Sequence, residues 1–169
     1  EDSITTAINT HYKGQLYSGE FAASGHITLS TEVEGSSTNV TVYMSYYEFQ
    51  FENGIFEKCS DVTGPAKLSF SKDSLGNYSL TEFLEPVKKG NKYNIALQTM
   101  FSDDDIAKIN NIETDESQMQ VINDQIISSV KDYLTYIGRS ESKIALDYQE
   151  KNYPPLDTKN AILFDVLYK

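Results

Sequence analysis

Residues 38–54, TNVTVYMSYYEFQFENG, decide the fold of this chain. Their β-branched and aromatic side chains predict a long strand. Asn53-Gly54 predicts a tight hairpin turn at its end, because both central residues of a type I′ turn need positive φ. The apolar side chains occupy first even and then odd positions: Val40, Val42, Met44 and Tyr46, followed by Tyr47, Phe49 and Phe51. A phase change inside a strand predicts a β-bulge, here near residues 45–47, and a concave aromatic face.

Strand patterns continue on both sides of this stretch. Period-two alternation and bounding turns predict strands over residues 20–33, 55–59, 67–72 and 78–84. The stretch 60–65 between two of them is typical of a loop or a broad bulge. Consecutive strands joined by short turns pair antiparallel, so we expect residues 20–85 to form a meander.

Helical patterns flank the meander. Residues 3–12 carry apolar side chains at helical spacing. Ser102 precedes an acidic first turn and predicts a short helix to about residue 110. The clearest helix follows a cap at Thr114 or Asp115. Its apolar residues recur every three or four positions and are Met119, Ile122, Ile126, Val130, Leu134 and Ile137.

Two further segments have weaker patterns. Tyr93, Ile95 and Leu97 alternate and predict a short strand. Residues 139–169 form a tail whose structure the sequence leaves open. Within the tail, residues 160–168 fit either a helix or a buried strand.

These patterns together predict a fold class. The amphipathic helix within the helical part, residues 102–138, needs an apolar surface, and a sheet that buries one face supplies it. We therefore expect a single α+β domain over residues 1–169. It should be a curved antiparallel meander of four to six strands packed on one face by helices, broadly cystatin-like or nuclear-transport-factor-like.

Composition argues against several functional classes. The chain has 14 Lys and Arg against 25 Asp and Glu, a formal net charge of −11, so it lacks the cationic face that nucleic-acid binding needs. The single cysteine, Cys59, cannot form an internal disulfide, and no Cys/His cluster suits zinc. No apolar run predicts a membrane span, and a signal or anchor is either absent or already removed before Glu1. We expect no cofactor and no metal.

No catalytic motif stands out. The chain has no phosphate-binding glycine loop, HExxH or GxSxG. It has three SxxK matches, but chance alone predicts about 1.4 in a chain of this composition, so they carry little weight. His11 and His26 are isolated, which favours surface or hydrogen-bonded roles over catalysis. The acidic residues between positions 103 and 116 favour helix capping over calcium binding. Three strand carboxylates could form an acid–base pair, although solvent-facing charge is the simpler interpretation. These are Glu48, Glu82 and Glu85.

The candidate binding surface is aromatic. The chain has 12 Tyr and 8 Phe, and many of them fall on the second predicted strand. Tyrosine is favoured at contact surfaces because it is large and rigid and has a polar tip. The candidate binding residues are Tyr43, Tyr46, Tyr47, Phe49 and Phe51. Core and sheet packing is the alternative for the same side chains.

Two longer strings resemble a known family. They are GEFAASGHITLSTEVEGSSTNVTVYMSYYEFQFENG and GPAKLSFSKDSLGNYSLTEFLEP. They contain an F-x-N-G hairpin, a PxxxxF strand and a G-x-Y-x-L strand that closes in Glu85-Pro86. In this order they resemble the domain C-terminal to the membrane-embedded peptidase unit in many Firmicute metallopeptidases of the β-lactam-sensor (antirepressor) type.

The resemblance covers roughly residues 2–136, and this chain departs from the family at two points within that range. Leu84 stands where the family often has an aromatic residue before Glu-Pro. Residues 87–101 match poorly, and the last thirty or so residues do not match. The peptidase unit is absent, so its activity does not carry over to this chain.

The resemblance implies an extracytoplasmic bacterial domain with a role in sensing or protein contact. We therefore predict a non-enzymatic binding or regulatory domain, secreted or membrane-anchored, that meets a protein or small-molecule ligand at the cell envelope. The alternative is a small hydrolase or isomerase with a cavity between sheet and helix. A helix that fills the concave face with Met119, Ile122, Ile126 and Val130 would remove that cavity. Self-association through an edge strand or the tyrosine surface is a third interpretation.

Overall fold

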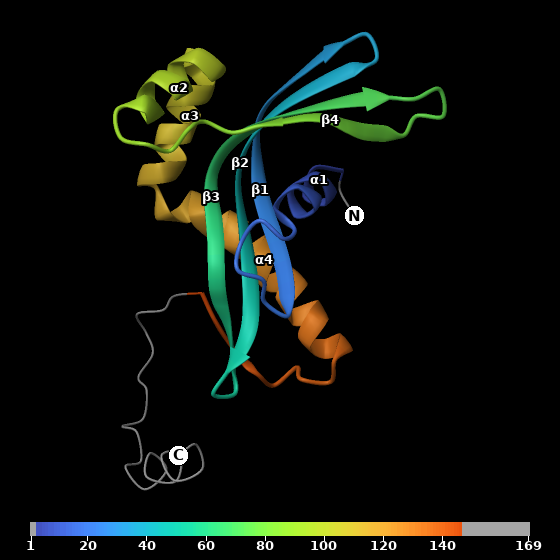
Figure 1. The fold of residues 1–169 in the computed structure, drawn as a ribbon, viewed down its shortest axis with the longest axis vertical. Coiled ribbons are helices and arrows are strands. Elements are labelled where there is room, and N and C mark those ends of the chain that lie inside the picture. Colours follow the sequence, from blue (N-terminus) through green and yellow to red (C-terminus); the bar gives the residue numbers. More distant parts are fainter. Residues whose placement is uncertain (1–2, 147–169) are drawn as a thin grey trace, which may run out of the picture.

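The computed structural model describes residues 3–146, and a curled antiparallel sheet runs through its centre (Figure 1). The strands lie in the order β1-β2-β3-β4. They are β1 (Phe21–Glu34), β2 (Ser37–Glu52), β3 (Ile55–Lys72) and β4 (Tyr78–Leu84). A short fifth strand, β5 (Lys143–Ala145), pairs in parallel with the start of β3. The predicted α+β class and curved antiparallel meander are confirmed.

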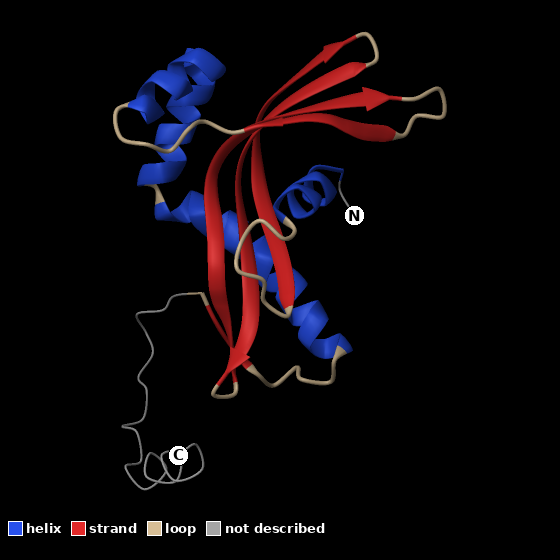
Figure 2. Ribbon diagram, viewed as in Figure 1, coloured by secondary structure: helices blue, strands red, loops and turns tan. Residues whose placement is uncertain are grey.

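Helices surround the sheet (Figure 2). They are α1 (Ser3–Tyr12), α2 (Lys92–Met100), α3 (Asp103–Thr114) and α4 (Glu116–Tyr136). Ser102 caps α3, because its side chain accepts a hydrogen bond from the Asp105 amide at 3.1 Å. Asp115 caps α4 by accepting from the Ser117 amide at 2.9 Å. The helices predicted at 3–12, after Ser102 and after Asp115 are confirmed.

Strand β2 is buried on both of its faces. Its odd-numbered aromatic side chains pack against the buried stripe of α4, which is Ile122, Ile126, Val130 and Leu134. Its even-numbered side chains Val40, Val42, Met44 and Tyr46 pack against Ala7, Ile8 and Tyr12 of α1. Helices were expected on one face only. That holds for α2, α3 and α4, whereas α1 covers the opposite face.

Burial on two sides explains the phase change in the sequence of β2. The predicted bulge near residues 45–47 is wrong, because β2 pairs with β1 in continuous register through this stretch. The register shifts fall on the neighbouring strands, at Leu29, Cys59 and Thr81. The predicted hairpin is confirmed, with positive φ at Asn53 (50°) and Gly54 (79°).

Two other segments differ from expectation. Residues 60–65 are neither a loop nor a broad bulge, since β3 runs through them and only Cys59 is left out of the register with β2. The strand predicted at 93–97 is wrong, because these residues lie in helix α2. Tyr93 and Leu97 also fit helical spacing, and Ile95 between them is 63% exposed.

Two remaining predictions concern the end of the chain and membrane spans. The helix or strand expected at residues 160–168 lies outside the described residues. Among the described residues, no helix has both the length and the apolar character to cross a membrane.

Candidate functional site

The aromatic candidates lie mostly inside the molecule. Tyr43, Tyr46, Tyr47 and Phe49 are buried, and Phe51 is half-buried beneath the Arg139 guanidinium, whose carbon lies 4.4 Å from the ring centre. Tyr46 faces α1, while the other four face α4. The four buried side chains therefore follow the alternative interpretation, which is that they pack in the core and not on a binding surface.

The buried tyrosine hydroxyls point to polar groups on the helices. Tyr43 donates to Glu113 at 3.5 Å, and Tyr93 donates to the same carboxylate oxygen at 3.2 Å. Tyr47 donates to Asn123 Oδ1 at 3.2 Å. Burial and the Glu113 charge raise the pKa of Tyr93 to about 12 and also raise the pKa of Tyr43. The Tyr43 and Tyr93 phenols therefore stay protonated donors. The bonds of Tyr43 and Tyr47 tie β2 to α3 and α4, and the bond of Tyr93 ties α2 to α3.

Helix α4 fills the concave face of the sheet. Ile122, Ile126 and Val130 are fully buried there, with Met119 packed beside them. These are the side chains that an enzyme cavity between sheet and helix would have to displace. The hydrolase or isomerase alternative stays a prediction.

A polar cluster lies on the other face, between β2 and α1. The Glu48 carboxylate accepts from Tyr46 Oη at 2.6 Å and from the Gly19 amide at 3.1 Å. Glu48 is only 5% exposed, so its interpretation as a solvent-facing charge is wrong. Position 48 belongs to the even face of β2, and α1 and the residues that follow it cover this face.

Glu85, after β4, holds a second group of side chains on this face. It accepts a hydrogen bond from Tyr12 Oη, and its other oxygen lies 3.5 Å from His11 Nε2. His11 stacks on Phe83 with 3.8 Å between ring centroids. Burial, followed by the bond to Glu85, raises the pKa of Tyr12 well above its ordinary value. These contacts attach α1 to the end of β4.

Two further observations on the described residues concern nucleophilic and metal chemistry. Burial raises the pKa of the Cys59 thiol, and the nearby Glu48 charge adds to the effect, which is opposite to what a nucleophilic thiolate needs. Within residues 3–146, no group of three or more His, Cys, Asp or Glu residues is placed to hold a metal ion.

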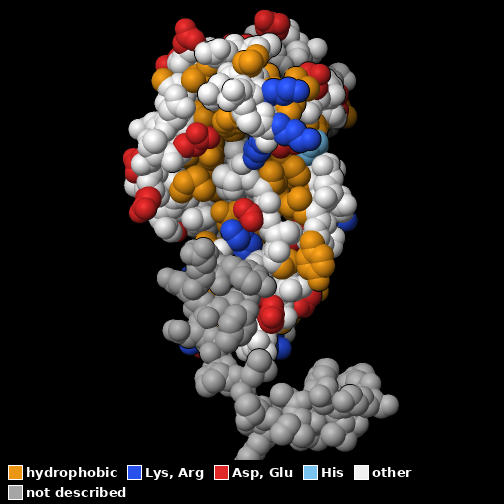
Figure 3. Space-filling model, turned by 60° about the vertical axis from the view of Figure 1, so that its left-hand side comes forward, with side chains coloured by type: hydrophobic (Ala, Val, Ile, Leu, Met, Phe, Trp, Pro, Cys, Tyr) orange, Lys and Arg blue, Asp and Glu red, His pale blue; other side chains and the backbone are white. Residues whose placement is uncertain are grey.

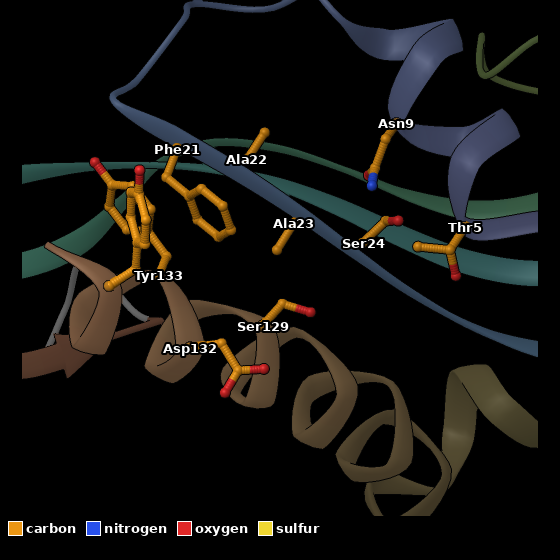
Figure 4. A pocket seen from close by; sticks show the side chains of 10 residues that line it. Thr5, Asn9, Phe21, Ala22, Ala23, Ser24, Ser129, Asp132 and Tyr133 are labelled. Atoms are coloured by element: carbon orange, nitrogen blue, oxygen red, sulfur yellow. The ribbon is translucent and has the colours of Figure 1, made fainter. Parts of the chain in front are cut away.

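A groove beside β1 combines polar, acidic and aromatic side chains (Figure 4). We call it the β1 groove, and its volume is about 510 Å³. Helix α1 forms one wall and helix α4 the other, with the first part of β1 between them. Its lining residues are Thr5, Asn9, Phe21, Ala22, Ala23, Ser24, Ser129, Asp132, Tyr133 and Tyr136.

Helical periodicity builds both walls of the β1 groove. Thr5 and Asn9 are one turn apart on α1, beside its buried stripe. Ser129, Asp132, Tyr133 and Tyr136 follow the spacing i, i+3, i+4, i+7 on α4, beside the stripe that packs on the sheet. The sequence analysis did not predict these residues. Their helical spacing on α4, next to the apolar stripe, was the signal that could have identified them.

The floor of the β1 groove is the free edge of the sheet. No other described strand pairs with β1 on the side away from β2. At His26 this edge is closed by Gln125, whose side-chain amide accepts from the His26 N–H at 2.9 Å and donates to its carbonyl at 3.0 Å. Backbone groups two residues apart point the same way along a strand, so those of Ala22 and Ser24 also point to this edge.

Ser24 is the polar group at the bottom of the groove. It is 4% exposed, and its hydroxyl oxygen is buried without a hydrogen-bond partner among the described residues. A buried hydroxyl without a partner costs free energy that an incoming donor or acceptor can recover.

The charge near the groove is acidic. Asp132 lies on the α4 wall, and Glu20 precedes the strand close enough to Tyr133 that, after burial, its charge raises the pKa of that phenol. A neighbouring depression of about 290 Å³ shares Asn9 and Ala22 with the groove, and it is lined by Glu20, Glu48 and Lys13 among others.

On the face shown in Figure 3, hydrophobic side chains form several separate patches among charged ones.

Comparisons with protein-family models, with curated proteins and with solved structures gave no match to this chain. The resemblance to the Firmicute domain therefore rests on the quoted motifs alone.

Proposed function

We propose that this chain is a non-enzymatic binding domain that acts outside the cytoplasm and recognises its ligand in the β1 groove. One observation carries the assignment to this groove. The Ser24 hydroxyl, which is buried without a hydrogen-bond partner among the described residues, lies between the α1 wall and the α4 wall, and the α4 wall carries Asp132 and Tyr136. Pockets that combine an apolar lining with a few converging polar groups are the usual binding sites of proteins.

The filled interior supports the same proposal. Because α4 packs tightly on the sheet, ligand contacts have to come from the outer surface. The extracytoplasmic location follows from the family resemblance. It is tested by fusing alkaline phosphatase, which is active only outside the cytoplasm, to the full-length protein in its native host. A fusion protein that is produced but has no phosphatase activity would overturn the location.

Binding is tested by filling the groove. Ser129→Trp places an indole in the α4 wall, and Ser128→Trp places the same group on the exposed side of the helix. Both variants and the unmodified chain are immobilised and offered muropeptides and a phage-displayed library of random 12-residue peptides. We expect retained ligands to bind the unmodified and Ser128→Trp chains but not Ser129→Trp.

A second blocking variant and a folding measurement distinguish a blocked groove from a misfolded protein. Thr5→Trp fills the groove from α1, and thermal melting followed by circular dichroism shows whether each variant folds. The proposal is wrong if no probe binds, or if binding is equal in the blocked and control variants.

A further inference from the structure

We infer that the β1 groove takes an extended, basic peptide segment of a partner protein, which adds to the free edge of β1 as a further strand. The inference rests on the proposed function, because it names the occupant of the same groove. Three independent features of the described residues carry it: the open backbone edge, the two chemically different walls and the acidic rim.

The backbone edge supplies the first feature. The N–H and C=O groups of Ala22 and Ser24 point into the groove, and strand addition satisfies such groups in many peptide-binding domains. Gln125 already makes this pair of bonds at the next outward residue, His26. Its side chain imitates the partner strand there, so the peptide lies beside Ala22–Ser24 and ends at Gln125.

The two walls set the sequence pattern of the peptide. Side chains alternate between the two faces of an added strand. Those on the α1 side meet Thr5, Asn9 and the Ser24 hydroxyl, which suit a small hydroxyl residue. Those on the α4 side meet Asp132, Tyr133 and Tyr136.

The α4 wall suits Lys or Arg. The Asp132 carboxylate can pair with a cation, and Tyr136, which is 88% exposed, offers a ring on which a guanidinium or ammonium can lie. Among residues 3–146, no Lys or Arg lines the groove itself, and the net charge of −11 attracts a basic partner at long range. The expected pattern is a basic residue next to Ser or Thr.

The test starts from the random 12-residue library and the chain of residues 1–169. Retained peptides should be enriched in Lys or Arg beside Ser or Thr. A fluorescein-labelled synthetic copy of the commonest peptide is then titrated and followed by anisotropy. Asp132→Asn should weaken binding about tenfold, as loss of a charge-assisted hydrogen bond predicts. Asp124→Asn on the same helix, outside the groove, should leave it unchanged.

Amide hydrogen exchange measured by NMR tests strand addition directly. With saturating peptide, the amides of Ala22 and Ser24 should exchange at least tenfold more slowly. The amides of Ala23 and Gly25 already point to β2, so their exchange should not change. Uniform protection of all four, or none, would overturn strand addition.

The outcomes separate the two proposals. The added strand is refuted if a peptide binds in the groove but does not slow amide exchange at Ala22 and Ser24 selectively. The basic character is refuted if the bound peptide lacks Lys and Arg and its affinity is the same for the Asp132→Asn variant. In both cases the proposal that the groove binds a ligand stands. If only muropeptides are retained and Ser129→Trp blocks their binding, the added basic strand is likewise refuted while groove binding stands. If nothing binds the groove, both proposals are wrong.

Discussion

Glu48 places a carboxylate between β2 and the residues that follow α1, where water has little access. A buried charge is costly unless donors surround it. The Tyr46 hydroxyl and the Gly19 amide are such donors, and they come from different parts of the chain. Burial followed by the bond to Glu48 raises the pKa of Tyr46, which keeps the phenol a donor at neutral pH.

Removing one donor should therefore destabilise the domain. We expect Tyr46→Phe to lower the free energy of unfolding by about 1.5–3 kcal/mol, the usual range for a hydrogen bond to a charged group. Urea unfolding followed by circular dichroism measures the loss. The control is Tyr17→Phe, at a residue that is 67% exposed, with an expected change within about 0.5 kcal/mol. Equal losses in the two variants would show that the bond to Glu48 contributes nothing.

Helix α4 is attached to β1 by apolar packing and by one amide side chain. The helix comes so close that a Cβ at Gly25 would lie 2.4 Å from the Ile122 carbonyl oxygen, which only glycine avoids. One turn further along α4, Gln125 makes its two hydrogen bonds to the backbone of His26. These contacts hold the helix along the strand and close the edge beyond the β1 groove.

Gln125→Ala should loosen this attachment. The variant loses both hydrogen bonds to His26, so we expect faster amide exchange at His26 and a free energy of unfolding lower by about 1–3 kcal/mol. Gln120→Ala is the matched control, because Gln120 lies on an exposed part of the same helix and bonds only within it, to Asp124 at 2.6 Å. An unchanged exchange rate at His26 would mean that Gln125 does not protect the edge in solution.

Across the whole molecule, protonated tyrosines connect α1 with the end of β4, β2 with α3, and α2 with α3. Tyr12 bonds to Glu85 on the α1 side, while Tyr43 and Tyr93 bond to Glu113 on the α3 side. Each pKa is raised, first by burial and then through its carboxylate partner. The native state therefore holds these protons more tightly than the unfolded chain, in which a tyrosine titrates near pH 10.

This linkage predicts weaker stability in alkali. The contribution of Tyr93 is complete below about pH 10 and is lost as the pH rises through its folded pKa of about 12, because the unfolded state then releases protons first. We expect the urea midpoint to fall steadily above pH 10. Glu113→Gln removes the charge that raises the pKa of Tyr43 and Tyr93, so its midpoint should fall less steeply. A midpoint independent of pH in this range would refute the linkage.

Features that depend on neighbouring residues were predictable from the sequence by itself. The Asn53-Gly54 turn, the Ser102 cap and the apolar spacing of α4 all act over a few residues, and each is confirmed. Because consecutive strands with short turns can only pair antiparallel, the meander also followed from local signals. Segment 93–97 is one exception, since short apolar runs fit a strand and a helix equally well, and segment 60–65, predicted as a loop or broad bulge, is another, since it lies within β3.

Only the tertiary structure decided which surfaces meet. Burial of β2 on both faces depends on helix α1, from the start of the chain, packing on its even-numbered side chains. This packing explains the change of apolar phase that predicted a bulge, and it encloses Glu48. The β1 groove likewise joins Thr5, Ser24 and Asp132 from three distant segments. Sequence spacing reports which side chains share a face of one element, whereas a site between elements depends on how those elements pack.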